Sequence, residues 1–146
     1  MDQYIEFAGN HYLLVFSLIC VIFLLIQDLL ASSFSKFGSV SPLIAVTKMN
    51  TEDAVVIDIR EPAEFLKSHV EDAINIPLGK LEEQLPSLEK YQSRPIIVLC
   101  QTGARSVTAC KTLSKNGFGQ VFNMLGGMQS WEDNKLPIKI SSKNKD

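Results

Sequence analysis

The hydrophobic pattern divides the chain into an apolar N-terminal segment and a longer part in which short apolar runs alternate with polar positions. Residues 13–26 read LLVFSLICVIFLLI, and Ser17 is the only polar residue among them. The wider segment 12–31, about 20 residues, matches a hydrocarbon core of about 30 Å at the α-helical rise. We therefore predict one transmembrane helix over residues 12–31, preceded by an N-terminal tail over residues 1–11.

Two other interpretations of this segment stay open. A buried helix of a soluble core is seldom apolar on every face, as this one is. A cleaved signal peptide usually opens with positive charges and has a shorter apolar run. Residues 1–11 contain no Lys or Arg, although Ala31-Ser32-Ser33 fits a cleavage site. The uncleaved anchor fits best, with Asp28 near one end of the helix, where a carboxylate costs less than at the bilayer centre.

After residue 40 the pattern changes to strand-length apolar runs separated by amphipathic stretches. The preceding Ser- and Gly-containing stretch, residues 32–40, is interpreted as a linker, residues 41–138 as one domain, and residues 139–146 as a polar C-terminal tail. Strands are predicted at residues 54–59, 73–77, 95–100 and 120–125. Helices are predicted at residues 42–49, 61–69, 79–90 (broken at Pro86), 103–117 and 126–134. This alternation predicts an α/β fold whose central, mostly parallel sheet is flanked by helices.

Composition and charge narrow the class of protein further. The chain has 146 residues, of which 46% are hydrophobic and 21% charged, which excludes disorder as its main state. A net charge of −2 argues against nucleic acid as a partner. Three scattered cysteines are too few for a disulfide scaffold or a structural zinc site.

The distribution of basic residues predicts an orientation for the anchor. Residues 1–35 contain no Lys or Arg, whereas Lys36 and Lys48 follow the apolar segment. Positive charges flanking a membrane helix favour the cytoplasmic side. We therefore expect a single-pass protein of the inner cell membrane, with its N-terminus outside and its domain in the cytoplasm.

Candidate chemistry concentrates where the third predicted strand meets the longest predicted helix, in the run PIIVLC-QTGA-RSVTAC. Ligands of open α/β sheets bind beyond the carboxyl ends of the strands, where Cys100 stands. A loop that closes onto a helix N-terminus points several N–H groups at one spot, and these favour a thiolate. Gly103 permits a tight curl, and Arg105 adds a positive charge. The competing interpretation is a buried structural cysteine.

The chain from residue 41 to 138 resembles the single-domain rhodaneses, a family of sulfurtransferases. Three signatures appear in the family's order: residues 58–77, which contain DIRE, EF, SHV and AINIP; residues 100–106, which contain Cys, Gly, Arg and Ser; and residues 125–131, which contain LGGM and Trp. Leu136-Pro137 then follows as in the family. Ser68 and Asp72 stand where the family usually has glycine, which puts the local turn geometry in doubt.

The resemblance implies a mechanism. The Cys100 thiolate would attack the outer sulfur of thiosulfate or of a persulfide donor, either a small molecule or a persulfide-carrying protein. The resulting Cys100 persulfide would pass its sulfur to a thiol or another nucleophile, and the mechanism would need no metal and no organic cofactor. The substrate-binding residues would be Gln101, Thr102, Gly103, Ala104, Arg105 and Ser106. The alternative is a non-catalytic module of the same fold that binds a protein partner at the membrane.

Several residues near the predicted site allow two interpretations. Arg105 either orients an anion or braces the loop through a salt bridge. Asp58 and Arg60 either shape the pocket rim or form an internal ion pair with loop amides. For His69 we favour a hydrogen bond that holds a turn over a role as general base.

The remaining candidates lie on either side of the loop. Gly126 and Gly127 are expected to allow a close turn beside it. Cys110 is interpreted as a core residue, with a resolving thiol as the alternative.

The length of the loop disfavours phosphatase activity. Phosphatases of related fold have one residue more between Cys and Arg than the four here, Gln101 to Ala104, so the loop encloses too little space for a phosphate. The Cys100 thiol is expected to reach solvent and to have a low pKa, and such a thiol survives best in a compartment that keeps thiols reduced. This agrees with the prediction of a cytoplasmic domain.

Overall fold

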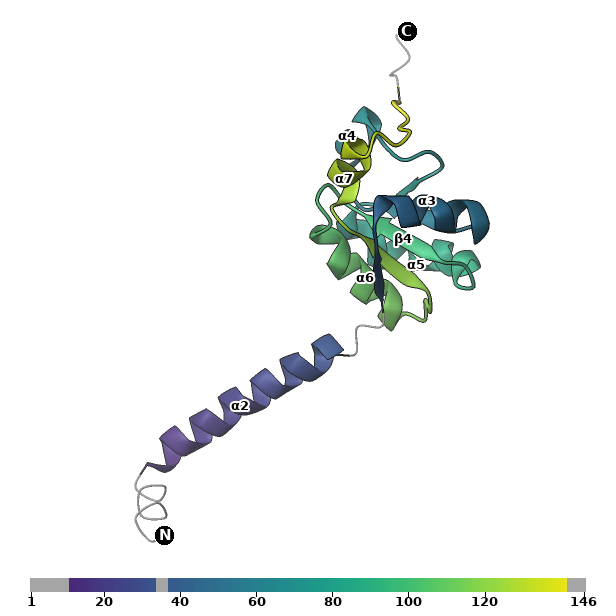
Figure 1. The fold of residues 1–146 in the computed structure, drawn as a ribbon. Coiled ribbons are helices and arrows are strands. Elements are labelled where there is room, and N and C mark those ends of the chain that lie inside the picture. The colour runs from purple at the N-terminus through teal and green to yellow at the C-terminus, as the bar shows by residue number, and fades with distance from the viewer. Residues whose placement is uncertain (1–10, 34–36, 142–146) are drawn as a thin grey trace. The chain divides into compact units, whose positions relative to one another are not determined.

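The computed structural model describes residues 11–33 and 37–141, which belong to two separate units, residues 1–35 and residues 36–146. The first unit contains helix α2 (Tyr12–Ser33), coloured purple to blue in Figure 1. Its large apolar side chains are exposed, from Tyr12 at 67% to Ile26 at 48%. The helix extends two residues past the predicted end at residue 31.

The predicted transmembrane helix is not confirmed. Among the described residues, no helix combines the length and the apolar character that a bilayer crossing requires.

The second unit is built on a five-stranded sheet in the order β1-β5-β4-β2-β3, and every neighbouring pair is parallel. The strands are β1 (Gly38–Val40), β2 (Val55–Asp58), β3 (Ile74–Asn75), β4 (Ile96–Leu99) and β5 (Val121–Met124). All residues of β2 and β4 are buried, as expected for β-branched runs in the middle of a covered parallel sheet. The predicted α/β fold with a parallel sheet is confirmed.

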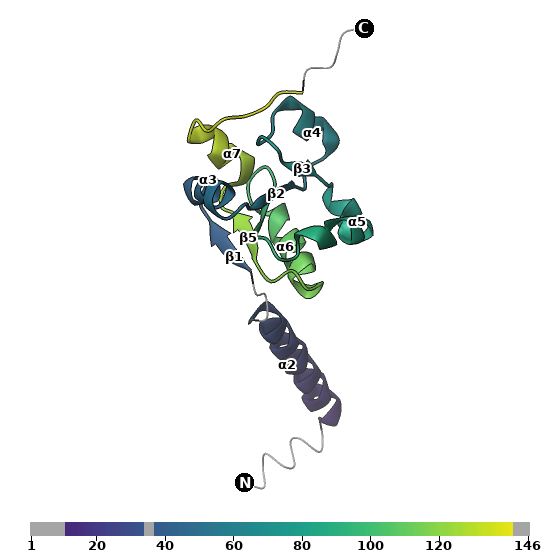
Figure 2. The same cartoon turned by 90° about the vertical axis from the view of Figure 1, so that its right-hand side faces the viewer.

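Helices cover both faces of this sheet (Figure 2). On one face, α5 (Leu81–Leu88) and α6 (Arg105–Lys115) pack against alternate strand residues such as Ile57 and Val98. On the other face, α3 (Pro42–Thr51) and α7 (Gly127–Asp133) pack against the residues between, such as Val56 and Ile97. Three short elements complete the fold: α4 (Pro62–Lys67) and the 3₁₀ turns η1 (Leu78–Lys80) and η2 (Glu89–Tyr91).

The interpretation of residues 32–40 as a linker is wrong for its last three residues. Gly38, Ser39 and Val40 form β1, which pairs with Phe122, Asn123 and Met124 of β5. Only Val40 of this strand is buried. A three-residue edge strand with a single buried apolar side chain is too short to show the alternation of apolar and polar residues that indicates a strand. Its Ser and Gly residues therefore led to the prediction of a linker.

Pro86 does not break its helix, contrary to the prediction. Helix α5 continues through Pro86 to Leu88 and then passes into η2. Leu81 and Leu88 are each only 1% exposed, at the two ends of α5. Burial of these side chains offsets the hydrogen bond that proline removes.

Capping residues mark the ends of two helices, and the domain extends past its predicted C-terminal boundary. The Ser41 hydroxyl accepts the Ile44 N–H at 3.4 Å as the N-cap of α3, and Asn116 caps α6 at its C-terminus. The predicted polar tail begins too early, because Lys139 pairs its backbone with His69 through bonds of 2.9 and 2.8 Å. This bridge joins the end of the domain to the turn after α4.

Candidate active site

Cys100 lies directly beyond the carboxyl end of β4, where the chain leaves the sheet and turns toward α6. The Gly103 N–H donates to Cys100 Sγ at 3.1 Å, and Ser106 Oγ lies 3.5 Å from the same sulfur. The sequence predicted a thiol that reaches solvent. That prediction is wrong, because the exposed fraction of Cys100 is 0%. Gly103 adopts a φ of 89°, and this left-handed conformation lets the loop turn so that the Gly103 N–H meets the sulfur.

The environment of Cys100 favours the thiolate. Burial raises the pKa of the Cys100 thiol, but hydrogen bonds from the Ser106 side chain and from the N–H groups of Ser106, Thr102 and Gly103 lower it. The net result is a pKa below the ordinary value for cysteine. Because a thiolate is the nucleophilic form of cysteine, the loop provides what a nucleophile needs.

A buried amide on β5, Asn123, supports the loop from below. Its Oδ1 accepts the hydroxyl hydrogen of Ser106, and its Nδ2 donates to the Gly103 carbonyl at 3.2 Å. Asn123 is 5% exposed, so an unsatisfied amide would be costly at this position. Asn123 was not among the residues predicted from the sequence, although a single amide within an otherwise apolar strand was a visible signal.

The N-terminus of α7 holds the loop from the side. The N–H groups of Met128 and Gln129 donate to the carbonyl oxygens of Cys100 and Gln101 at 2.8 and 3.0 Å. A Cβ atom on Gly127 would overlap the Cys100 carbonyl oxygen and come within 2.8 Å of the Gly103 nitrogen. The close turn beside the loop, predicted for Gly126 and Gly127, is therefore present.

Asp58 and Arg60 form the predicted internal ion pair, at the end of β2. Arg60 Nη2 lies 2.7 Å from Asp58 Oδ2, and both side chains are buried. The predicted bonds to loop amides are absent from the described residues, because Asp58 accepts instead from the Nε, Nη2 and backbone N–H groups of Arg60. The link to the loop is a side-chain bond, from Arg60 Nη1 to Gln101 Oε1 at 3.1 Å.

Arg105 forms a salt bridge at the rim of the loop. Its Nη2 lies 3.1 Å from Glu64 Oε1, and its Nη1 donates to Glu64 Oε2 at 3.3 Å. This pairing raises the pKa of Arg105 and lowers that of Glu64. The structure thus contains the loop-bracing interaction, and Glu64 is a partner that the sequence analysis missed, since it is 41 residues away along the chain.

His69 and Cys110 are not part of the polar contacts around Cys100. Nδ1 of His69 bonds to the Phe65 carbonyl oxygen at 2.8 Å, and its ring stacks on Phe65 at 3.9 Å. These contacts match the predicted turn-holding interpretation. Cys110 is buried in α6, and burial raises its pKa to about 12, which is typical of an inert core thiol.

The two departures from the family's glycines have different consequences. Ser68 has a φ of −163°, an extended conformation that any residue adopts, and its hydroxyl donates to Glu132 at 2.8 Å. Asp72 has a φ of 61°, in the left-handed region. Aspartate tolerates that region better than most residues, so the turn keeps its shape at some cost in strain.

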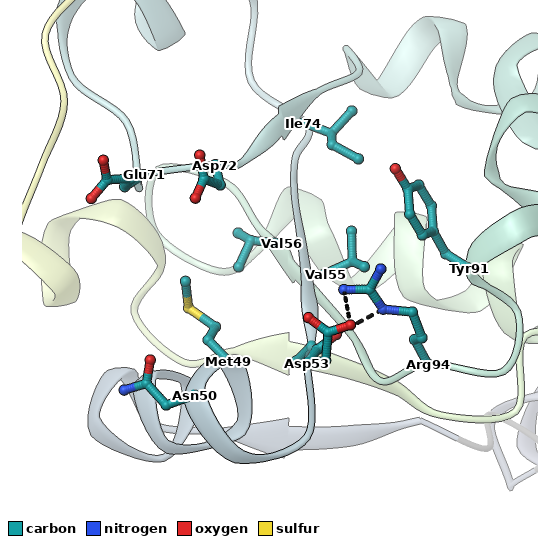
Figure 3. A pocket seen from close by; sticks show the side chains of 11 residues that line it. Met49, Asn50, Asp53, Val55, Val56, Glu71, Asp72, Ile74, Tyr91 and Arg94 are labelled. Atoms are coloured by element: carbon teal, nitrogen blue, oxygen red, sulfur yellow. Dashed lines mark hydrogen bonds and ion pairs between the residues drawn. The ribbon is translucent and has the colours of Figure 1, made fainter.

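A cavity of about 420 Å³ lies away from the Cys100 loop (Figure 3). It is lined by residues at or before the amino ends of β2 and β3, such as Val55 and Ile74, whereas Cys100 follows the carboxyl end of β4. Arg94 at its edge bonds to Asp53 at 2.9 Å. This cavity is therefore separate from the candidate active site.

Comparisons with known proteins agree with the fold. The profile of the family described as "Rhodanese-like domain" matches residues 41–134. The uncharacterized protein YibN of Escherichia coli K12 is 30% identical over 139 residues, 94% of this chain and 97% of YibN. A protein of Allochromatium vinosum named sulfurtransferase is 36% identical over 89 residues, 61% of this chain and 81% of its own. The crystal structure of a rhodanese-related protein from Thermoplasma volcanium superposes with a TM-score of 0.64 at 30% identity, over 70% of this chain and 98% of that one.

Proposed function

The chain belongs to the rhodanese-like domain family, and on that premise we propose that it is a sulfurtransferase acting through Cys100. The observation that carries the proposal is the hydrogen bonding of the Cys100 sulfur by the Gly103 N–H and the Ser106 side chain, which lowers the pKa of the thiol. A nucleophilic thiol at a strand end, enclosed by N–H groups, suits attack on a sulfane sulfur.

The reaction takes place in two displacements. The Cys100 thiolate attacks the outer sulfur of thiosulfate, the sulfur–sulfur bond of the donor breaks, and sulfite leaves with the electron pair. With a persulfide donor, a thiolate leaves instead. An acceptor thiolate then attacks the terminal sulfur of the Cys100 persulfide and restores the Cys100 thiolate. The N–H groups of loop residues 101–106 stabilise the charge on sulfur at each stage.

The proposal is tested by turnover of the full chain. We expect sulfite release from thiosulfate with cyanide as acceptor, and loss of that release in Cys100→Ser. Cys20→Ser is the matched control, because Cys20 lies in α2 and outside the domain that holds the loop. Equal turnover by wild type and Cys100→Ser contradicts the proposal.

A non-catalytic binding module is the second candidate function. The family includes many chains whose function is not assigned, and YibN is named as uncharacterized. An intact nucleophilic loop favours the enzyme over this alternative. The binding module is supported if wild type and Cys100→Ser bind a protein partner equally well and neither form shows turnover.

We further propose that the apolar segment 12–31 anchors the protein in the inner membrane, with the N-terminus outside and the rhodanese-like domain in the cytoplasm, although no helix of the described residues meets the requirement for a span. Residues 12–27 contain no charged side chain, and the apolar ones are exposed. The match to YibN spans 94% of this chain, so it includes most of this segment. A reporter fused after Asp146 that is active only in the cytoplasm supports the topology. Release of the full chain by alkaline carbonate contradicts the anchor.

A further inference from the structure

Both arginines that contact the loop region are already paired with carboxylates. Arg60 is held by Asp58 in a buried pair in which the two side chains are 3% and 0% exposed. Arg105 is held by Glu64, with side chains 43% and 33% exposed. An incoming anion therefore meets no unpaired guanidinium from these two residues.

The Glu64 carboxylate is fixed in position from two directions. Its Oε2 accepts the backbone N–H of Glu61 at 3.2 Å, as part of the capping box that opens α4. The same carboxylate binds both terminal nitrogens of Arg105, one oxygen to each, at 3.1 and 3.3 Å. Two parallel bonds of this kind give the pair a defined geometry as well as attraction.

Arg105 connects the Glu64 carboxylate to the Cys100 loop, because it belongs to that loop in the sequence and bonds to Glu64. It is the first residue of α6 and the last position of the Cys-x-x-Gly-x-Arg run, so its guanidinium stands at the rim of the loop. Besides Glu64, the charge of the Cys100 thiolate raises the pKa of Arg105. The guanidinium is therefore the positive charge of the loop that interacts electrostatically with the sulfur.

We propose that Glu64 is a specificity-determining residue that acts through Arg105, disfavouring the doubly charged donor thiosulfate and favouring donors with one negative charge or none, such as persulfides. This inference rests on the proposed sulfurtransferase function and names its donor class. To bind thiosulfate through Arg105, the site must first break the Glu64 salt bridge or bring the dianion close to that carboxylate. A persulfide has no such requirement.

The charge balance of the two reactions supports this preference. Attack of the Cys100 thiolate on thiosulfate gathers three negative charges, and it yields the Cys100 persulfide anion and sulfite dianion. Attack on a protonated persulfide gathers one negative charge: the donor's sulfur–sulfur bond breaks, the donor leaves as a thiolate, and the proton stays on the transferred sulfur. The second reaction needs much less help from a free cation.

The proposal is tested first by binding, without turnover. In the full chain carrying Cys100→Ser, thiosulfate affinity is measured by calorimetry with and without Glu64→Gln, a change that keeps a side chain able to complete the capping box. We expect Glu64→Gln to tighten thiosulfate binding by about twofold to fivefold, the range for releasing an exposed ion pair. Glu71→Gln is the matched control, because Glu71 is also an exposed carboxylate in a salt bridge, with Lys139 at 2.9 Å.

Kinetics with the native Cys100 then separate specificity from structure. Glu64→Gln is expected to lower the KM for thiosulfate with little change in kcat. The kcat/KM for the persulfide of N-acetylcysteine methyl ester, which has at most one charge, should change less than twofold. Unchanged thiosulfate affinity in the Cys100→Ser background, or an equal gain in Glu71→Gln, overturns the proposal. The binding measurement does not need sulfur transfer. If only the proposed sulfurtransferase function fails, turnover is absent while the effect of Glu64→Gln on thiosulfate affinity is still observed.

Discussion

At the scale of single residues, the reactivity of Cys100 is set by competition between burial and hydrogen bonding. Burial raises the pKa of this thiol, and the hydrogen bonds of the loop lower it further than burial raises it. Ser106 is central because its hydroxyl oxygen lies 3.5 Å from the Cys100 sulfur and donates its hydrogen to the Asn123 amide oxygen. The helix α6 thus affects the thiol through a side chain as well as through its backbone.

Ser106→Ala is expected to raise the pKa of Cys100, since the Ser106 side chain is one of the groups that lower it. The measurement is the rate of iodoacetamide alkylation of Cys100 against pH. Alkylation follows the thiolate, so the midpoint of the profile should move to higher pH in the variant. Ser114→Ala is the control on the same helix, because the buried Ser114 hydroxyl has no hydrogen-bond partner among the described residues. An unmoved midpoint in Ser106→Ala contradicts this account.

Asp72 provides a second residue-scale prediction. With a φ of 61°, it occupies a conformation in which glycine has no steric penalty. Asp72→Gly should leave the free energy of unfolding unchanged or raise it by up to about 1 kcal/mol, because relief of strain exceeds the entropy that glycine adds. Asp72→Val should lower it by about 1–2 kcal/mol, since β-branched residues tolerate this region poorly. Urea denaturation of the full chain checks the order, and Val more stable than Gly refutes it.

The site residues that the sequence predicted are those close together along the chain. Cys100, Gly103 and Ser106 belong to one loop and one helix start, where local rules suffice to predict a stabilised thiolate. Glu64 and Asn123 reach the loop from 41 and 17 residues away. No local pattern indicates such pairings, because only the folded sheet brings these residues to the same edge.

At the scale of elements, prediction succeeded where the apolar pattern was long and failed where it was short. β2 and β4 are runs of consecutive buried residues, which a parallel sheet requires. β1 has one inward side chain, Val40, and was predicted as linker. The intrinsic preference of Pro86 predicts a break in the helix. The helix nevertheless continues through Pro86, because the buried leucines of α5 stabilise it by tertiary packing.

Packing of α7 against the loop gives an element-scale prediction. Gly127→Ala should lower the free energy of unfolding by about 2–4 kcal/mol and slow persulfide formation, because the new Cβ overlaps the Cys100 carbonyl oxygen. Gly119→Ala is the matched control, since a Cβ there meets nothing within 4 Å. Thermal or urea unfolding together with sulfite release measures both effects. Equal stability of the two variants contradicts the assigned role of this close approach.

At the scale of the whole molecule, the topology determines where the chemistry lies. Parallel strands bring their carboxyl ends to one edge, and the Asp58–Arg60 pair after β2 meets the Cys100 loop after β4 at that edge. The alternation of apolar runs was sufficient to predict this architecture. The cavity at the opposite edge, seen in Figure 3, had no counterpart in the sequence, because it is formed by turns whose residues are far apart in the chain.

The central claim is that Cys100 carries the transferred sulfur, and the mass of the protein tests it most directly. After treatment of the reduced full chain with thiosulfate or a persulfide donor, we predict a mass increase of one sulfur atom, localised to the Cys100 peptide and removed by cyanide. No increase should occur in Cys100→Ser. A wild-type protein that gains no sulfur from either donor, or gains it elsewhere than on Cys100, contradicts the account.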